Sequence, residues 1–144
     1  MSGIPTNIWG PKAWDFLNCV AFSYPEKNVS LTKKNKTKAF FENLGGVLPC
    51  PKCGNDYSGL IKKYPIDYNL DNRNDLPRWL YKIHNLVNEK LGIPMDDTPS
   101  YEEVKRKYES CDLSSSKTKK EYYLRDMVYI LIIIILLIIL FRKK

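Results

Sequence analysis

The 144-residue sequence has only four cysteines and one histidine. Its cysteines, Cys19, Cys50, Cys53 and Cys111, are too few and too unevenly spaced for the disulfide framework of a small secreted protein. A zinc site usually needs four ligands, and the chain has neither a second CxxC nor a HxxxH pair. We therefore expect no metal site.

Strand patterns are also missing. No segment alternates apolar and polar residues with β-branched enrichment, and no internal repeat is visible. Residues 1–10 have neither the basic nor the apolar stretch of a signal peptide. The length fits one modest domain, which we expect to be all-α.

Charge is absent from residues 127–141, which read MVYILIIIILLIILF. The mean hydropathy of −0.38 therefore averages two unlike parts. Fifteen residues reach roughly 22 Å as a helix, short of a roughly 30 Å bilayer core, but Arg125 and Arg142 can snorkel at its ends. The pattern predicts a single-pass C-terminal anchor over 127–141, with residues 1–111 as a cytosol-facing domain and 112–126 as a polar linker. A buried helix of the domain is the alternative.

The formal charge is +7, and Arg142, Lys143 and Lys144 supply three of these charges. The densest basic cluster lies between Lys33 and Lys38, without interleaved aromatics or a nucleic-acid-binding module. A solvated helix face is the favoured interpretation, and we expect no nucleic-acid partner.

Apolar periodicity, prolines and glycines predict the helices. Pro11 suits a first helical turn, and Pro25 and Pro65 close helices. Asp75 is a plausible N-cap, and Gly92 suits a C-cap. Helices are expected over about 11–23, about 30–46, from the CxxC to Tyr64, from 75 to 92, and, as a short fifth helix, over about 100–109.

The segment Pro49-Cys50-Pro51-Lys52-Cys53 contains the strongest candidate for a reactive site, the pair Cys50 and Cys53. Three residues of separation at a helix start bring two thiols into disulfide range. The helix N-terminus and Lys52 both favour the reactive thiolate. A redox dithiol fits best. Half of a zinc site and a thioredoxin-like site fit less well, the latter because strands are lacking.

The fourth helix carries His84, Asn85 and Asn88 among apolar residues. His84 and Asn88 are four apart and share a helix face. A lone histidine on such a helix is usually structural, but buried amides need hydrogen-bond partners. A polar cofactor inside the bundle would supply them. Trp9 and Trp14, near the first helix start, are either core residues or flank a planar ring.

The order WG-P-x-x-W, PCxxC and WLxxxHNxVNxxLG resembles the Erv/ALR family of FAD-linked sulfhydryl oxidases over about residues 8–111. The minimal size and the lysine-, asparagine- and isoleucine-rich composition look most like members from large DNA viruses. The resemblance implies a four-helix bundle with a short fifth helix, a homodimer, and FAD inside each subunit. If the chain is viral, the anchor would lie in a host membrane or the virion.

Residue roles follow from the resemblance position by position. Cys53 would lie next to the flavin, and Cys50 would exchange with substrate. The implied FAD-binding residues are Gly10, Lys12, Trp14, Asn18, His84, Asn88 and Lys90, with Asn18 in place of a histidine found in many relatives.

Several family features are missing. Tyr81 stands where many relatives have a cysteine of a structural disulfide, and no partner cysteine lies near Asp97. No shuttle CxxC or CxC is present. Cys111 falls where some relatives place a cysteine that links subunits, without its usual partner, and Cys19 is expected to be buried.

The expected function is oxidation of protein thiols to disulfides, with molecular oxygen as acceptor and hydrogen peroxide as product. The alternative is a non-enzymatic redox or zinc-binding adaptor on a membrane. A flavin absorbance spectrum separates the two.

Overall fold

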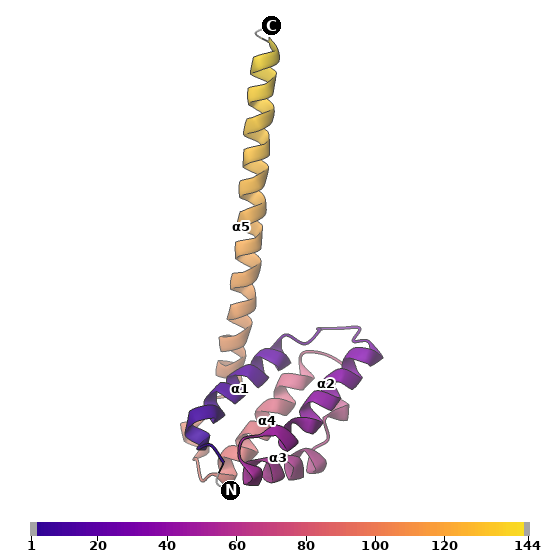
Figure 1. Cartoon of the computed structure of the whole chain (residues 1–144), viewed down its shortest axis with the longest axis vertical. Helices are drawn as coiled ribbons and strands as arrows, with labels where there is room; N and C mark the ends of the chain where they lie inside the picture. Colours follow the sequence, from indigo (N-terminus) through magenta and orange to yellow (C-terminus); the bar gives the residue numbers. More distant parts are fainter. Residues whose placement is uncertain (1–2, 143–144) are drawn as a thin grey trace. The chain divides into compact units, whose positions relative to one another are not determined.

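Residues 3–142 are described by a computed structural model, with side chains for 3–109 and 123–134. Two compact units divide the chain, Met1–Lys105 and Arg106–Lys144. Over the described residues every regular element is a helix (Figure 1). The α-helices are α1 (Thr6–Phe22), α2 (Leu31–Asn43), α3 (Pro51–Lys63), α4 (Asp75–Lys90) and α5 (Tyr101–Arg142), and the short 3-10 helices are η1 (Leu44–Val47), η2 (Ile66–Asn69) and η3 (Met95–Asp97).

The helix ends follow from local capping. The Ser30 side chain accepts a hydrogen bond from the Lys33 amide at the start of α2. At the start of α4, the Asn72 side chain accepts from the amides of Asn74 and Asp75. Asn72 therefore caps this end, and the predicted cap at Asp75 is wrong. Gly92 ends α4 at φ +72°, a conformation that favours glycine.

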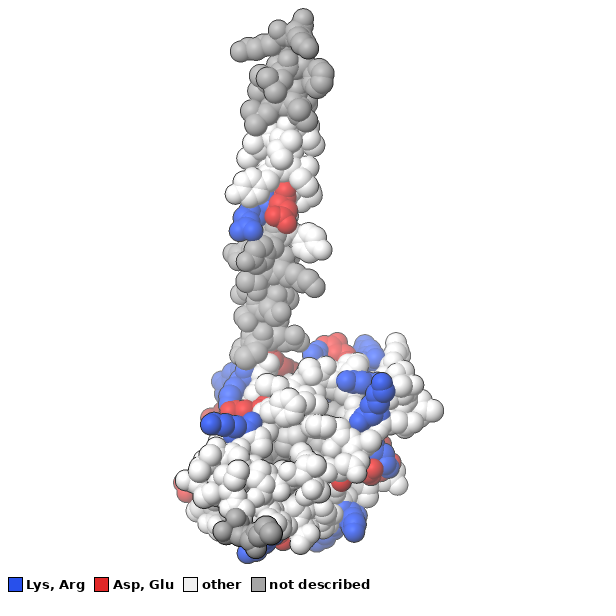
Figure 2. Space-filling view, in the orientation of Figure 1, with Lys and Arg blue, Asp and Glu red and all other residues white. Residues whose placement is uncertain are grey.

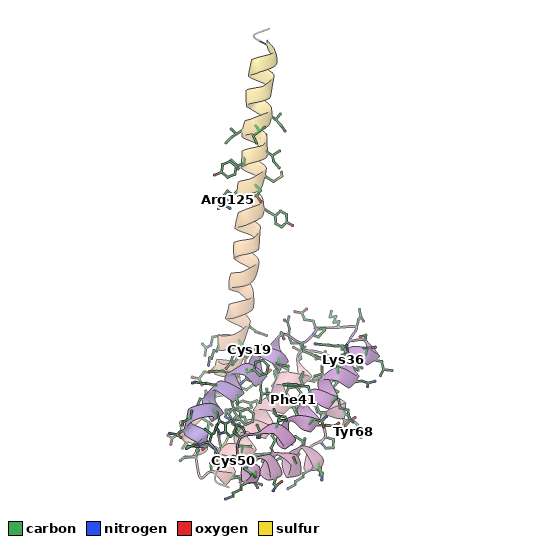
Figure 3. The ribbon with its side chains drawn as sticks, viewed as in Figure 1. Cys19, Lys36, Phe41, Cys50, Tyr68 and Arg125 are labelled. Atoms are coloured by element: carbon green, nitrogen blue, oxygen red, sulfur yellow. A yellow bond between two sulfur atoms is a disulfide. The ribbon has the colours of Figure 1, made fainter. Side chains whose placement is uncertain are left out.

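The predicted four-helix domain is present in the first unit. Its core is formed by apolar residues of α1–α4, and Phe41 lies at its centre (Figure 3). The polar groups of two buried aromatic side chains form hydrogen bonds with backbone carbonyls. The Tyr57 hydroxyl donates to the Phe41 carbonyl, and the Trp79 indole N–H donates to the Tyr64 carbonyl. This bundle positions the residues described below. Its fully or nearly fully buried apolar members include Leu17, Ala21, Tyr24, Phe41, Leu76, Leu80 and Ile83.

Tyr81, where the resemblance implies a cysteine of a structural disulfide, links α4 to the start of α5. Its hydroxyl donates to the Pro99 carbonyl at 3.1 Å. Its ring packs edge-on against Tyr101 with centroids 5.5 Å apart. The Arg78 guanidinium lies 4.3 Å from the centroid of the Tyr101 ring. A non-covalent cluster thus joins α4 to the start of α5.

The predicted transmembrane anchor over 127–141 is wrong. No helix among the described residues is long and apolar enough to cross a bilayer. Fifteen apolar residues span roughly 22 Å, well under the roughly 30 Å required, and charged Arg125 and Asp126 come directly before them. Residues 135–141 lie outside the described side chains. The expected single-pass membrane location is wrong on the same finding.

Two further expectations need correction. The fifth helix is not short, because helical backbone runs from Tyr101 to Arg142 and includes the expected linker. Cys19 is exposed rather than buried, since it lies on the outer side of α1 (Figure 3). Cys111 lies outside the described side chains.

The basic cluster on α2 is partly neutralised by acids of the loop after α3. Lys34 pairs with Asp71, and Lys38 pairs with Asp67 and with Glu42 on its own helix. On the face shown in Figure 2, charged side chains lie mainly at the edges, and the middle of the bundle is largely uncharged.

Candidate active site

Cys50 and Cys53 form a disulfide at the N-terminus of α3, with Cα atoms 5.2 Å apart. Cys50 is the N-cap, and its Sγ accepts a hydrogen bond from the Cys53 amide at 3.2 Å. Pro51 occupies the first turn, where a missing N–H costs nothing. Both cysteines are half-buried. The positive end of the helix favours a thiolate once the bond is reduced.

A close approach of two glycines fixes the loop that leads into this pair. A Cβ added to Gly54 would lie 2.3 Å from the Gly45 carbonyl oxygen. A Cβ added to Gly45 would lie 2.2 Å from the Ser58 hydroxyl. Only glycine allows η1 to contact α3 this closely. Neither Gly45 nor Gly54 was predicted to make this contact.

Trp14 of α1 and His84 of α4 stack against each other. Their ring centroids are 4.0 Å apart, and the ring planes differ by 17°. The sequence singled out both residues separately, and the fold brings them together. Burial lowers the pKa of His84 to about 4. The imidazole is therefore neutral at pH 7, and the pair presents a flat, uncharged aromatic surface.

The buried neutral histidine predicts a pH-dependent stability. In the unfolded chain His84 takes up a proton below about pH 6.5, whereas in the folded protein it resists protonation until about pH 4. The free energy of unfolding should therefore fall as pH drops from 6.5 to 4, by on the order of 2 kcal/mol after solvent screening. Denaturant unfolding across this range measures the effect.

The His84→Asn variant is the control for this prediction. It keeps a neutral polar side chain but cannot titrate, so its unfolding free energy should vary less over the same window. The carboxylates of Asp56 and Asp67, whose pKa values are lowered by Lys90 and Lys38, contribute equally to both proteins. Parallel pH profiles for the two proteins would contradict the prediction.

Two amides lie in the same helix pair. Asn18 is buried on α1, and its Nδ2 donates to the Trp14 carbonyl at 2.9 Å. Asn88 is buried one turn after His84 on α4. Four of the predicted cofactor residues, Trp14, Asn18, His84 and Asn88, are thus on facing helices, α1 and α4.

The other three predicted cofactor residues are placed differently. Lys90, at the end of α4, donates a hydrogen bond to the Asp56 carboxylate at 2.8 Å. Asp56 lies on α3, one turn after Cys53, so this contact links the two helices. Sequence reasoning missed Asp56. Lys12 is exposed on α1, and a Cβ added to Gly10 would meet nothing within 4 Å. Gly10 lies one turn before Trp14 on α1, and the assignment of both residues to the cofactor stays a prediction.

Comparison with known proteins shows similarity in both sequence and fold. Residues 11–109 match the Erv1/Alr family over most of the chain's length. The chain belongs to the Erv1/Alr family. The match includes the disulfide, the stacked pair and both buried amides.

Two curated relatives of the Erv1/Alr family illustrate the similarity. A probable FAD-linked sulfhydryl oxidase of Acanthamoeba polyphaga mimivirus is 38% identical over 90 residues, which are 60% of this chain and 61% of that protein. The mitochondrial FAD-linked sulfhydryl oxidase erv1 of Schizosaccharomyces pombe is 35% identical over 86 residues, 60% of this chain and 47% of that protein. The chain therefore matches less than two thirds of the length of either relative.

A solved Erv1/Alr structure has a similar fold. The FAD binding domain of Erv1 from Saccharomyces cerevisiae aligns with a TM-score of 0.65 at 27% identity, covering 74% of this chain and 96% of that one. The helical bundle of the first unit is thus the bundle of this family.

Proposed function

We propose that this chain is an FAD-linked sulfhydryl oxidase that introduces disulfide bonds into proteins. The observation that carries the proposal is the Cys50–Cys53 disulfide at the N-terminus of α3, in a family whose relatives are named for this activity. The substrates are thiol-containing proteins, and the electron acceptor is molecular oxygen, which becomes hydrogen peroxide.

The chemistry at the cysteine pair is thiol–disulfide exchange. A substrate thiolate attacks Cys50 Sγ, the bond between the two cysteines breaks, and Cys53 leaves as a thiolate. A second substrate thiolate then attacks the substrate sulfur of the mixed disulfide and releases Cys50. The substrate has lost two electrons and two protons, and the electrons remain on the reduced pair. The helix N-terminus stabilises the thiolates that form.

The residues of α1 and α4 fit a flavin. Trp14 and His84 supply a flat neutral surface, and the buried amides of Asn18 and Asn88 supply hydrogen-bonding groups beside it. Gly10, Lys12 and Lys90 complete the proposed FAD-binding set, with the two lysines as positive charges for phosphate groups. When bound, FAD supplies the transfer of the electron pair from the reduced cysteines to oxygen.

A visible absorbance spectrum of the purified full-length chain tests the proposal. Flavin bands in stoichiometric amount are expected, together with oxygen consumption when dithiothreitol is added. The competing function is a dithiol or zinc-binding adaptor without catalysis. Such a protein would be colourless and would consume no oxygen, and that outcome would sink the proposal.

We infer that the enzyme works as a homodimer, paired through the outer face of α1 and α2. Phe16 is 59% exposed and Phe40 is 36% exposed, and their rings meet edge-on with centroids 6.2 Å apart. Ile8 is exposed two turns before Phe16 on the same side of α1. The largely uncharged face in Figure 2 supports burial of this surface by a second copy.

Phe16→Glu is expected to weaken self-association at least about tenfold, because it buries a charge in the proposed interface. Sedimentation equilibrium measures the association constant. Tyr68→Glu serves as the control, since Tyr68 is an exposed aromatic residue on η2 rather than on α1 or α2 (Figure 3). Equal effects of the two substitutions would exclude this interface.

A further inference from the structure

The first described residues of the chain lie across the start of α3. The Ile4 amide donates to the Pro49 carbonyl at 3.2 Å. A Cβ added to Gly3 would lie 1.9 Å from that carbonyl oxygen and 2.9 Å from the Cys50 Cα. Figure 3 labels Cys50 at the end of the bundle where Figure 1 marks the N-terminus. Gly3 and Ile4 therefore lie against the backbone directly before and at Cys50, and we call residues 3–5 the strap.

Trp9 holds the strap from its other side. Its indole Nε1 donates to the Ile4 carbonyl at 3.0 Å. Two hydrogen bonds in series thus connect α1 to Ile4 and Ile4 to Pro49, so that both polar groups of the Ile4 backbone are engaged.

Several backbone groups next to Cys50 are unavailable to a bound peptide. Pro49 and Pro51 have no N–H, and the Cys50 carbonyl accepts from the Gly54 amide at 2.9 Å inside α3. The Pro49 carbonyl is an acceptor that an extended polypeptide can meet beside Cys50, by the pairing that bound peptides use at strand edges. The strap already occupies this carbonyl.

We propose that the strap determines substrate specificity at Cys50. A small dithiol reaches the sulfur past the docked strap, whereas a polypeptide thiol must first take the strap's place on Pro49. Gly3 and Trp9 are positioning residues in this scheme, because they act by docking the strap. This proposal rests on the proposed function, in which the substrate thiolate attacks Cys50 Sγ.

Gly3→Ala tests the proposal, because the added methyl group cannot fit against Pro49. We expect kcat/KM for reduced, unfolded ribonuclease A to rise about tenfold, equivalent to about 1.4 kcal/mol. The rate with dithiothreitol should stay unchanged. Gly46→Ala is the matched control, because Gly46 is an exposed glycine three residues before Pro49 whose Cβ would meet nothing within 4 Å. It should alter neither rate.

A second measurement does not depend on flavin or oxygen. In the fully reduced protein, the rate of Cys50 alkylation is followed by peptide mass spectrometry with N-ethylmaleimide and with a maleimide carrying a long polyethylene glycol chain. Gly3→Ala and Trp9→Phe should increase the rate at which the bulky maleimide alkylates Cys50. The rate with N-ethylmaleimide should not change. Trp9→Phe keeps an aromatic ring and removes the N–H that binds Ile4.

The outcomes separate the two proposals. Faster bulky alkylation in a protein that does not oxidise dithiothreitol would refute the oxidase and leave the strap standing. The strap proposal would be overturned if Gly3→Ala changed neither the alkylation rates nor the ratio of the oxidation rate of reduced ribonuclease A to that of dithiothreitol. A lower rate with reduced ribonuclease A alone would also overturn it, because the strap would then promote substrate binding.

Discussion

Replacing Cys53 by serine is expected to lower oxygen-dependent oxidation of dithiothreitol at least about a thousandfold, because the two cysteines act as one unit. Serine cannot accept the electron pair or reform the bond to Cys50. FAD should remain bound, since the stacked pair of Trp14 and His84 lies on α1 and α4 rather than on α3. An oxygen electrode measures turnover, and the visible spectrum measures bound flavin.

Cys50→Ser should abolish turnover as well, because the sulfur that exchanges with substrate is lost. The controls are Cys19→Ala and Cys111→Ala, since neither cysteine has a neighbour at CxxC spacing. Both are expected to keep the rate of dithiothreitol oxidation. Full activity in Cys50→Ser or Cys53→Ser would refute the assignment of the active pair.

The double substitution His84→Ala and Asn88→Ala is expected to weaken FAD binding about a hundredfold. A ligand that binds only the folded state stabilises it by mass action, so this loss corresponds to about 2.7 kcal/mol at saturating FAD. The thermal midpoint measured with excess FAD should therefore fall, and the gain in midpoint on adding FAD should shrink. Fluorescence titration of FAD gives the dissociation constant.

The matched control for this pocket is Lys82→Ala with Glu89→Ala. Both residues are exposed on α4 and so test the helix without touching its inner face. This variant should bind FAD as the parent does. If the His84 and Asn88 variant retained stoichiometric FAD and the same midpoint, the polar face of α4 would have another purpose.

Local sequence signals predicted the helices that build the bundle, because proline, glycine and apolar spacing act over a few residues. Pro51 and Gly92 mark real helix ends. The predicted start at Pro11 is wrong, because α1 begins at Thr6 and Pro11 lies inside it. The contact between Trp14 and His84 could not be derived in this way, since it depends on how α1 packs on α4. The strap on Pro49 was missed for the same reason.

The failures also have physical causes. Cys19 has apolar sequence neighbours, yet α1 is apolar on two sides, with Leu17 and Ala21 facing the core and Phe16 facing outward. Apolar neighbours therefore did not indicate burial. The membrane anchor was predicted from the apolar composition of residues 127–141. Their length argued against it, because fifteen residues are too few to cross a bilayer unaided. At α4, Asn72 outcompeted Asp75 because its side chain reaches two amides.

The Tyr81 cluster separates the redox chemistry of this protein from its structural integrity. Among the described residues, Cys50–Cys53 is the one disulfide, and the link from α4 to Tyr101 uses a hydroxyl, two aromatic rings and a guanidinium instead. None of these groups responds to thiols. A reductant that resets the active pair therefore leaves this link intact, and no cysteine at position 81 can divert a substrate into a dead-end mixed disulfide. In the proposed catalytic cycle, the protein passes through its reduced state without loosening the framework that holds the Cys50–Cys53 pair.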